Sequence, residues 1–122
     1  MKDGILLTIA LPYDVIYREK AGKVLLPAAV ADVLILEERA PSVFLLRDGV
    51  LRLFSADDKE IGAFFVKGGV ADVAADQCAV STEAAIAIKD ITAEAAAKQA
   101  EDAEREDDKR FYQMIAGYLT HR

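Results

Sequence analysis

Residues 50–73 read VLRLFSADDKEIGAFFVKGGVADV, and this stretch decides the class of fold that the sequence predicts. Two apolar runs flank the polar segment Ser55–Lys59, which has the length and composition of a hairpin turn. Gly68 and Gly69 then allow a sharp bend into the next apolar run, Val70–Val73. The stretch therefore predicts three short β-strands joined by tight connections.

Runs of the same kind continue on both sides of this stretch, with turn signals between them. Such spacing is typical of a β-sandwich or barrel, and no long helical pattern alternates with the runs. Two runs are apolar on both faces, which predicts well-covered strands. These two are Val33–Leu36 and Val43–Leu46, and the others are residues 5–10, 15–18, 23–27, 77–82 and 84–88.

Near residue 90 the pattern changes from strands to helices. Thr92 is a suitable N-cap residue, and six alanines between Ala93 and Ala103 favour a helix. Glu106-Asp107-Asp108 is expected to interrupt this helix and to cap a second one. The second helix carries an apolar stripe at helical spacing. Its members are Phe111, Ile115 and Tyr118, widened by Met114 and Leu119.

We therefore expect a mainly β protein with an α-helical appendage. A β-sandwich of about ten strands is expected over residues 1–89, followed by an antiparallel two-helix hairpin over residues 90–122. The alanine face of the first helix is expected to pack against the apolar stripe of the second. Lys109 and Arg110 lie in the first turn of the second helix, against its dipole, so an acidic neighbour is expected to offset them.

Charge and composition exclude several function classes. The net charge of −6 opposes nucleic-acid binding through a general basic field, and residues 90–108 are the most acidic segment. The longest apolar run is shorter than the roughly 18 residues of a membrane span. We expect no membrane insertion, and we read the N-terminal run as a first strand, not a signal peptide.

The chain also lacks the side chains that common active sites need. Cys78 is the only cysteine and His121 the only histidine, so neither a disulfide, a Cys/His pair in mid-chain nor a typical zinc site is expected. Cys78 is expected to pack as a small apolar group within a strand. No catalytic residue, metal ligand or cofactor is predicted, and the chain is expected not to be an enzyme.

Several motifs occur in an order that resembles the epsilon subunit of bacterial and chloroplast F-type ATP synthases, the delta subunit of mitochondria. That family has an acidic residue, an apolar strand, a Pro-Gly-His turn, then Ala-Pro and an apolar strand that ends in Gly-Val. Here Asp32 opens the run, Glu37-Glu38-Arg39 replaces the turn, Ala40-Pro41 follows, and Gly49-Val50 ends it. Phe65–Val73 resembles the family's strand–Gly-Gly–strand signature, and Leu7–Tyr17 resembles its first hairpin.

The resemblance implies a non-catalytic central-stalk subunit of a rotary, proton-translocating ATP synthase. It implies a sandwich that couples ring rotation to the catalytic head through the gamma subunit, and helices that regulate ATP hydrolysis. The implied partners are gamma and the membrane proteolipid (c) ring, with alpha or beta subunits as further contacts of the helices. The implied location is the cytoplasmic face of the bacterial inner membrane, with attachment only through the complex.

The resemblance also implies four interface residues: Asp32 toward arginines of the ring, and Arg39, Ala40 and Pro41 toward gamma. For Asp32 the alternative is a solvated loop carboxylate, and for Arg39 it is a turn arginine capped by Glu37 or Glu38. Gly68-Gly69 is expected to be a bend between strands and not a phosphate cradle.

One departure concerns ATP. Some family members bind ATP through an Ile-Asp-x-x-Arg-Ala sequence, and this chain reads Ile91-Thr92-Ala93-Glu94-Ala95-Ala96. Because the arginine is absent, the charge-assisted contact to phosphate has no donor, and we expect no tight ATP site. An unrelated small sandwich that binds a protein or a ligand is the alternative to the whole assignment.

Overall fold

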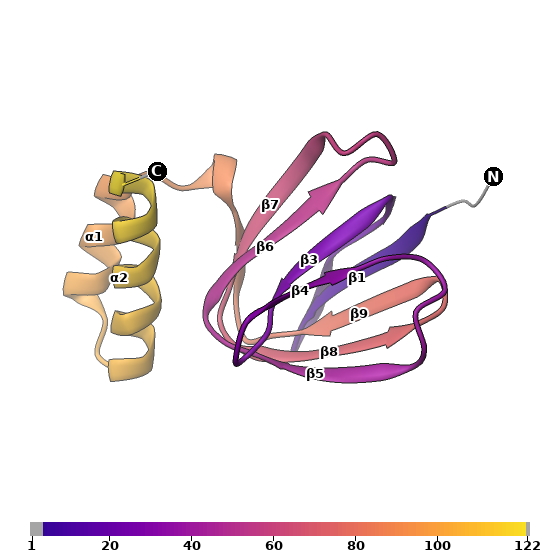
Figure 1. Ribbon diagram of the computed structural model, residues 1–122. Helices are drawn as coiled ribbons and strands as arrows, with labels where there is room; N and C mark the ends of the chain where they lie inside the picture. Colours follow the sequence, from indigo (N-terminus) through magenta and orange to yellow (C-terminus); the bar gives the residue numbers. More distant parts are fainter. Residues whose placement is uncertain (1–3, 122) are drawn as a thin grey trace.

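The computed structural model describes residues 4–121, so residues 1–3 and 122, the outer ends of the two expected regions, lie outside the described residues. Ten strands form two facing five-stranded sheets, and two helices follow at one end (Figure 1). One sheet has the order β2-β1-β9-β8-β5 and the other β10-β7-β6-β3-β4. The sandwich followed by two helices confirms the predicted fold class.

The ten strands lie close to the predicted runs. They are β1 Ile5–Leu11, β2 Asp14–Ala21, β3 Lys23–Pro27, β4 Asp32–Ile35, β5 Ser42–Leu46, β6 Gly49–Phe54, β7 Glu60–Val66, β8 Gly69–Ala74, β9 Gln77–Ser81 and β10 Ala85–Ala87.

The central hairpin pairs β6 with β7 across the predicted turn, and β10 pairs with the other side of β7. Among the strand pairs, β1 and β9 are the parallel one, with Leu6 opposite Gln77 and Ala10 opposite Ser81.

The core lies between the two sheets because alternate side chains of each strand point inward. Ile5, Leu7 and Ile9 are at most 1% exposed, as the alternation in the first run predicts. Cys78 faces the same core and is fully buried, which confirms its expected packing. Burial, with Asp72 as a nearby negative charge, raises the pKa of the Cys78 thiol to about 12, so the thiol stays protonated at neutral pH.

Gly68 and Gly69 form the bend that the sequence predicts between β7 and β8. Both have positive φ, 56° and 118°. A Cβ atom on Gly69 would lie 2.0 Å from the carbonyl oxygen of Ser81, so only glycine fits there. The pair is a backbone device that brings β8 against β9.

Two predicted strands differ from expectation in their coverage. Val33–Leu36 and Val43–Leu46 were expected to be covered on both faces, but β4 and β5 are edge strands. Leu34 and Leu36 are 42% and 47% exposed, and Val43 and Leu45 are 66% and 67% exposed. A two-sided apolar run reports side-chain chemistry, not the number of neighbours, so it could not distinguish a central strand from an apolar edge.

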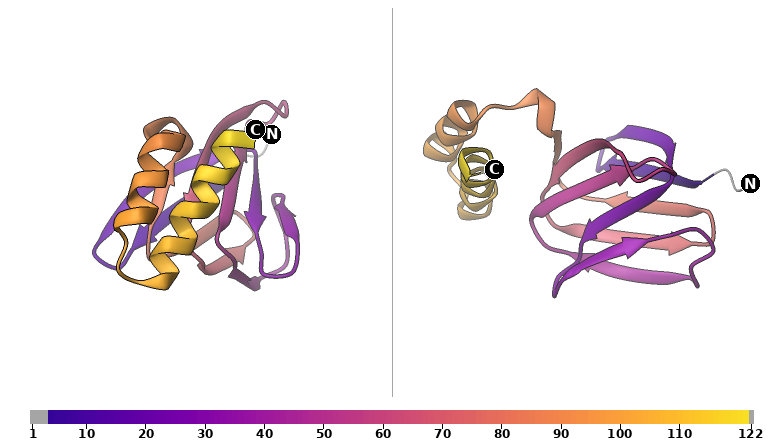
Figure 2. Two further views of the ribbon diagram at one scale, coloured as in Figure 1. Left: turned by 90° about the vertical axis from the view of Figure 1, so that its left-hand side faces the viewer. Right: turned by 45° about the horizontal axis from the view of Figure 1, so that its top comes forward.

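A short 3₁₀ turn, η1 (Ile88–Asp90), leads to the helices α1 (Ala93–Asp102) and α2 (Glu106–His121). The two helices lie side by side (Figure 2). The Thr92 hydroxyl accepts a hydrogen bond from the Ala95 amide at 3.1 Å, which confirms the predicted N-cap.

The predicted break between the helices was wrong in position. Glu106-Asp107-Asp108 lies inside the first turn of α2, and the chain turns at residues 103–105 instead. Three carboxylates at a helix N-terminus are favoured by the helix dipole, so the acidic run starts the helix.

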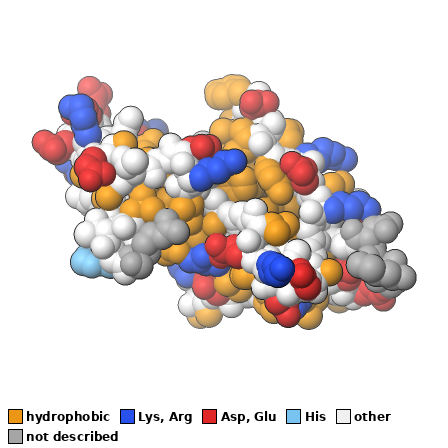
Figure 3. All heavy atoms as spheres, turned by 90° about the horizontal axis from the view of Figure 1, so that it is seen from above, with side chains coloured by type: hydrophobic (Ala, Val, Ile, Leu, Met, Phe, Trp, Pro, Cys, Tyr) orange, Lys and Arg blue, Asp and Glu red, His pale blue; other side chains and the backbone are white. Residues whose placement is uncertain are grey.

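The hairpin packs on the sandwich through a second, smaller cluster. Phe65 of β7 meets Phe111 and Ile115 of α2, and Ala96 of α1 completes the contact, as the stripe predicts. Figure 3 shows hydrophobic side chains gathered between the helices and the sandwich, and charged side chains over the outside of the helices.

Candidate partner interface

Asp32 lies at the start of β4, directly after the β3–β4 loop. Its carboxylate accepts a hydrogen bond from Arg47 Nη2 at 2.6 Å, and the other terminal nitrogen of Arg47 donates to the carbonyl of Ala28 at 2.5 Å. The Asp32 side chain remains 47% exposed, so the pair is a surface ion pair of small net stability. The predicted site residue is therefore engaged within the chain but accessible from outside it.

Arg39, Ala40 and Pro41 form the connection from β4 to β5. Glu38, just before them, has a left-handed φ of 62°, where the family's turn has glycine. The Arg39 guanidinium lies 5.3 Å from the centre of the Phe44 ring and donates a long bond of 3.5 Å to the Leu34 carbonyl. Its Nε is buried without a hydrogen-bond partner among the described residues, while Ala40 and Pro41 are exposed.

Asp32 and Arg39 lie at opposite ends of the sandwich. Asp32 pairs with Arg47, just past the end of β5 where Leu46 lies opposite Gly69. The turn that holds Arg39 is instead bound to the β8–β9 turn, because the Glu38 amide donates to the Ala75 carbonyl at 2.6 Å. A five-residue strand such as β5 spans about 17 Å, so the two predicted sites cannot contact the same small surface.

The exposed apolar side chains of β4 and β5 form a surface between these two ends, which we call the edge strip. Its members are Leu34, Leu36, Val43 and Leu45, together with Val70, which pairs with Leu45 across the strands. Arg39 joins the two edges, since it contacts both the Leu34 carbonyl and Phe44. The sequence did not assign these residues to a site, although two-sided apolar character was the available signal.

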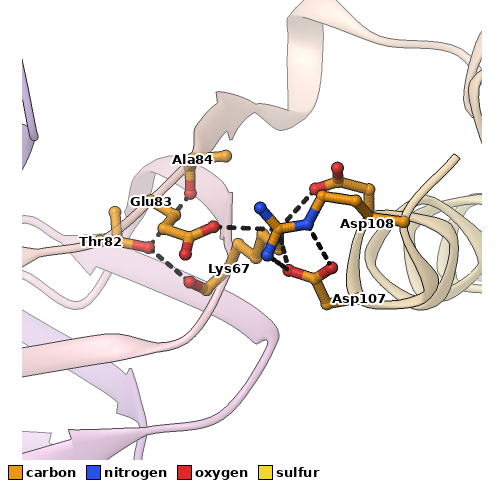
Figure 4. A network of polar contacts seen from close by, with 7 residues as sticks. Lys67, Thr82, Glu83, Ala84, Asp107 and Asp108 are labelled. Carbon is orange, nitrogen blue, oxygen red and sulfur yellow. Dashed lines mark hydrogen bonds and ion pairs between the residues drawn. The ribbon is translucent and has the colours of Figure 1, made fainter. Parts of the chain in front are cut away.

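A buried ion cluster joins the sandwich to α2 (Figure 4). Lys67, at the end of β7, is 8% exposed, and its ammonium group binds Glu83 at 3.0 Å, Asp107 at 2.8 Å and Asp108 at 2.5 Å. Burial opposes the charge of Lys67, but the three carboxylates outweigh it and raise its pKa. Lys67, Asp107 and Asp108 were not predicted as contacts, because 40 or more residues separate them in the sequence.

The same cluster lowers the pKa of Asp107, through Lys67 first and Arg105 second. Arg105 Nε and Nη2 each donate to Asp107 at 3.0 Å. Asp48 lies near Arg110, which supplies the acidic neighbour expected for that residue; burial nevertheless raises the pKa of Asp48.

A second polar contact lies near the other end of α2. Arg52 of β6 donates to the hydroxyl of Tyr118, and its charge lies 5.6 Å from the centre of the Tyr118 ring. Arg52 also pairs with Glu60 at 2.6 Å, and these bonds raise its pKa although burial opposes this. The ring of Tyr118 contacts Phe65 edge-on at 5.5 Å between centroids.

The described residues offer little for bond chemistry. Within residues 4–121, no group of His, Cys, Asp and Glu side chains is arranged to hold a metal ion. None of the helices in this range is long and apolar enough to cross a membrane. The surfaces that stand out are those for contact: the edge strip with Asp32 and Arg39 at its ends, and the face that receives α2.

Comparison with known proteins gives a consistent result across nearly the whole chain. The family model described as "ATP synthase, Delta/Epsilon chain, beta-sandwich domain" matches residues 5–88. The ATP synthase epsilon chain of Gluconacetobacter diazotrophicus is 31% identical over 105 residues, which cover 86% of this chain and 74% of that protein. The epsilon chain of Rhizobium rhizogenes is 27% identical over 128 residues, covering 99% and 94%.

Two solved structures share the fold at low identity. A chain in the mitochondrial ATP synthase of Euglena gracilis (OSCP/F1/c-ring) superimposes with a TM-score of 0.71 at 19% identity, covering 94% of this chain and 76% of that one. A chain in the central stalk/c-ring of the Tetrahymena thermophila mitochondrial ATP synthase gives 0.63 at 14%, covering 97% and 98%.

Proposed function

Because the chain belongs to the ATP synthase delta/epsilon family, we propose that it is the epsilon-type central-stalk subunit of a rotary, proton-translocating ATP synthase. The subunit carries out no bond chemistry; it couples the rotation of the proteolipid ring to the catalytic head through gamma. Membership of the family removes the alternative of an unrelated binding module. The observation that carries the coupling role is the edge strip, an apolar surface on a sandwich whose core is already filled.

The edge strip has the character of a protein contact surface. Its five side chains are 37–67% exposed and lie on adjoining edges of the two sheets. Edge strands with exposed apolar side chains are liable to associate unless a partner covers them. We assign gamma as the partner that covers the strip.

Asp32 and Arg39 then meet different partners. Arg39 adjoins the strip and retains a buried Nε without a hydrogen-bond partner among the described residues, so a gamma carbonyl or carboxylate is its natural acceptor. Ala40 and Pro41 shape the same contact. Asp32, at the other end, faces the proteolipid ring, where a ring arginine takes the place of Arg47.

The helices supply the regulatory part of the proposal, through contacts with alpha or beta subunits. No ATP ligand is assigned to them, because Thr92 serves as a helix cap where an acidic residue would begin the family's ATP sequence. Attachment to the cytoplasmic face of the bacterial inner membrane goes through the complex, in keeping with the absence of a spanning helix from residues 4–121.

Binding to the gamma subunit of the same synthase tests the proposal. Leu45→Asp puts a charge into the centre of the edge strip, and we expect its dissociation constant for gamma to rise about tenfold or more. Val15→Asp is the matched control, since Val15 is 53% exposed on β2, the opposite edge strand of the same sheet. Equal affinities for both variants and the unaltered chain would rule out the edge strip as the gamma contact.

The ring contact is tested separately. Asp32→Asn is expected to leave the affinity for gamma unchanged and to lower proton pumping by the reassembled synthase. Arg47→Gln is the control, because it breaks the internal pair but keeps the carboxylate of Asp32 free for the ring. If both variants pump alike, Asp32 does not contact the ring through its charge.

A further inference from the structure

The contact of α2 with the sandwich is fixed by charge at two points. At its first turn, Asp107 and Asp108 bind Lys67, and near its last turn the Tyr118 hydroxyl binds Arg52. Between these points the apolar contact is small, since Phe111 and Ile115 are the α2 residues that are fully buried against Phe65. The position of α2 therefore depends on the two polar contacts as well as on packing.

Lys67 has no equivalent arrangement without α2. Its ammonium group has three hydrogens, and Glu83, Asp107 and Asp108 each accept one. If α2 left, Lys67 would retain only Glu83 among these three, and the loss of partners for a buried charge is strongly unfavourable. Departure of α2 thus requires Lys67 to become hydrated, which makes the docked arrangement a distinct state and not one end of a continuum.

The helix α1 has no comparable anchor. Its buried residues are Ala96 and Ala100, which offer only methyl groups, and its ion pair Lys98–Asp102 lies within the helix and is exposed. Its backbone approaches α2 far more extensively than any strand. The first helix is therefore held on the molecule by α2 and by the connection at residues 88–92.

We propose that Lys67 and Arg52 form an electrostatic clamp on α2, and that α1 and α2 leave the sandwich together when this clamp opens. The pivot is the segment 88–92, which contains η1 and the Thr92 cap. The clamp belongs to the single chain, so it goes beyond the proposed function and does not require that function to be correct.

The charges around Lys67 determine what can open the clamp. They come from the β9–β10 connection, the β5–β6 turn, the helix connection and the first turn of α2. The groups are Glu83, Asp48, Arg105, Asp107, Asp108 and Arg110.

The pKa of Asp107 is lowered and that of Lys67 raised, so the pair stays charged from about pH 4 to pH 10. Within this range the clamp opens through competition by other charges, such as salt, and not through a change of pH.

Hydrogen exchange on the full chain tests the clamp. Lys67→Met keeps most of the side-chain volume and removes the charge. We expect the backbone amides of α1 and α2 to exchange about tenfold faster or more, and those of β1 and β9 to keep their rates. Lys98→Met, which removes an exposed lysine from α1, is the matched control and should change neither set. Unchanged exchange in α2, or an equal rise throughout the sandwich, would overturn the proposal.

A double variant tests the mechanism from the other side of the contact. Asp107→Asn with Asp108→Asn should accelerate exchange in both helices as Lys67→Met does, and adding Lys67→Met should then change the rates less than about twofold. Raising the salt concentration from 0.05 M to 1 M should accelerate exchange in the unaltered chain but not in the double variant. Full additivity of the two changes, or equal salt dependence, would show that Lys67 does not act through these carboxylates. No other synthase subunit enters these measurements, so their outcome is independent of the gamma-binding test.

Discussion

The sandwich and the helical hairpin are held by different amounts of apolar burial. Among the described residues, fifteen buried side chains fill the space between the sheets, whereas four form the cluster under the hairpin, and one of those, Phe65, belongs to the sandwich. The sandwich is further fixed by backbone geometry at Gly69, while the hairpin relies on Lys67 and Arg52. One chain thus joins a region stabilised mainly by packing to a region that charge helps to position.

The largest effect is expected at Gly69, where the sandwich tolerates no side chain. Gly69→Ala puts a Cβ against the Ser81 carbonyl at positive φ, and we expect the free energy of unfolding to fall by about 3 kcal/mol or more. Urea denaturation measures this loss. The control is Gly117→Ala in α2, where nothing lies within 4 Å of the new Cβ and a gain of about 0.5–1 kcal/mol is expected. A stable Gly69→Ala variant would contradict the role given to this bend.

Removal of the largest α2 side chain tests whether the two regions are separable. Phe111→Ala should cost the hairpin contact about 3–5 kcal/mol, since Phe111 is 1% exposed in a small cluster. We expect helical circular dichroism to decrease, while the NMR signals of β1 and β9 keep their native positions. Loss of both regions in a single transition would instead mean that residues 1–89 and 90–122 fold as one unit, against the predicted domain division.

Acid should affect the hairpin through Asp107. A carboxyl group whose folded pKa lies below its unfolded value stabilises the folded state above the unfolded pKa, and this stabilisation is lost as the pH falls. The unfolded value is 3.8, so helix docking should be constant from neutral pH down to about 4 and weaken below it. Hydrogen exchange of α2 between pH 7 and pH 3, corrected for intrinsic rates, measures this. Asp107→Asn should flatten the dependence, and a transition centred near pH 6 would point to a different group.

The smallest effect is expected at the far end of α2. Tyr118→Phe removes the hydroxyl that Arg52 binds but keeps the ring against Phe65. Arg52 retains Glu60, so we expect a loss of only about 1 kcal/mol in docking of the hairpin. Glu60→Gln is the comparison, because it weakens the other partner of Arg52 and should leave α2 in place. An effect of Tyr118→Phe as large as that of Phe111→Ala would reverse the ranking of packing and charge in this region.

Local patterns predicted most of the fold because they report on neighbours in sequence. The alternation of Ile5, Leu7 and Ile9, the polar turn after Phe54 and the Thr92 cap each have a short-range physical cause. Coverage of β4 and β5 has no such cause, because it depends on which strands lie beside them in the finished sheets. The start of α2 was misplaced for a related reason: the same carboxylates can end one helix or begin the next, and Lys67 is a long-range partner that favours the second outcome.

The candidate site was predicted only in part. Asp32 and the Arg39 turn came from the resemblance to the family, and their assignment to partners stays a prediction. The sequence did not indicate that they lie at opposite ends of the sandwich, nor that Leu34 and Leu45 are exposed between them. The Lys67 cluster requires contacts across 40 residues, which no periodicity in the sequence reports.

The parallel pairing of β1 with β9 has a consequence for the order of folding. The first strand of the chain cannot complete its hydrogen bonds until Gln77–Ser81 has been synthesised, since those residues form the neighbouring strand. The early strands must therefore remain incompletely paired on the ribosome while most of the sandwich is still to emerge, and closing so long a loop makes this step slow. The helices, made last, form from local contacts and find a finished surface to dock on.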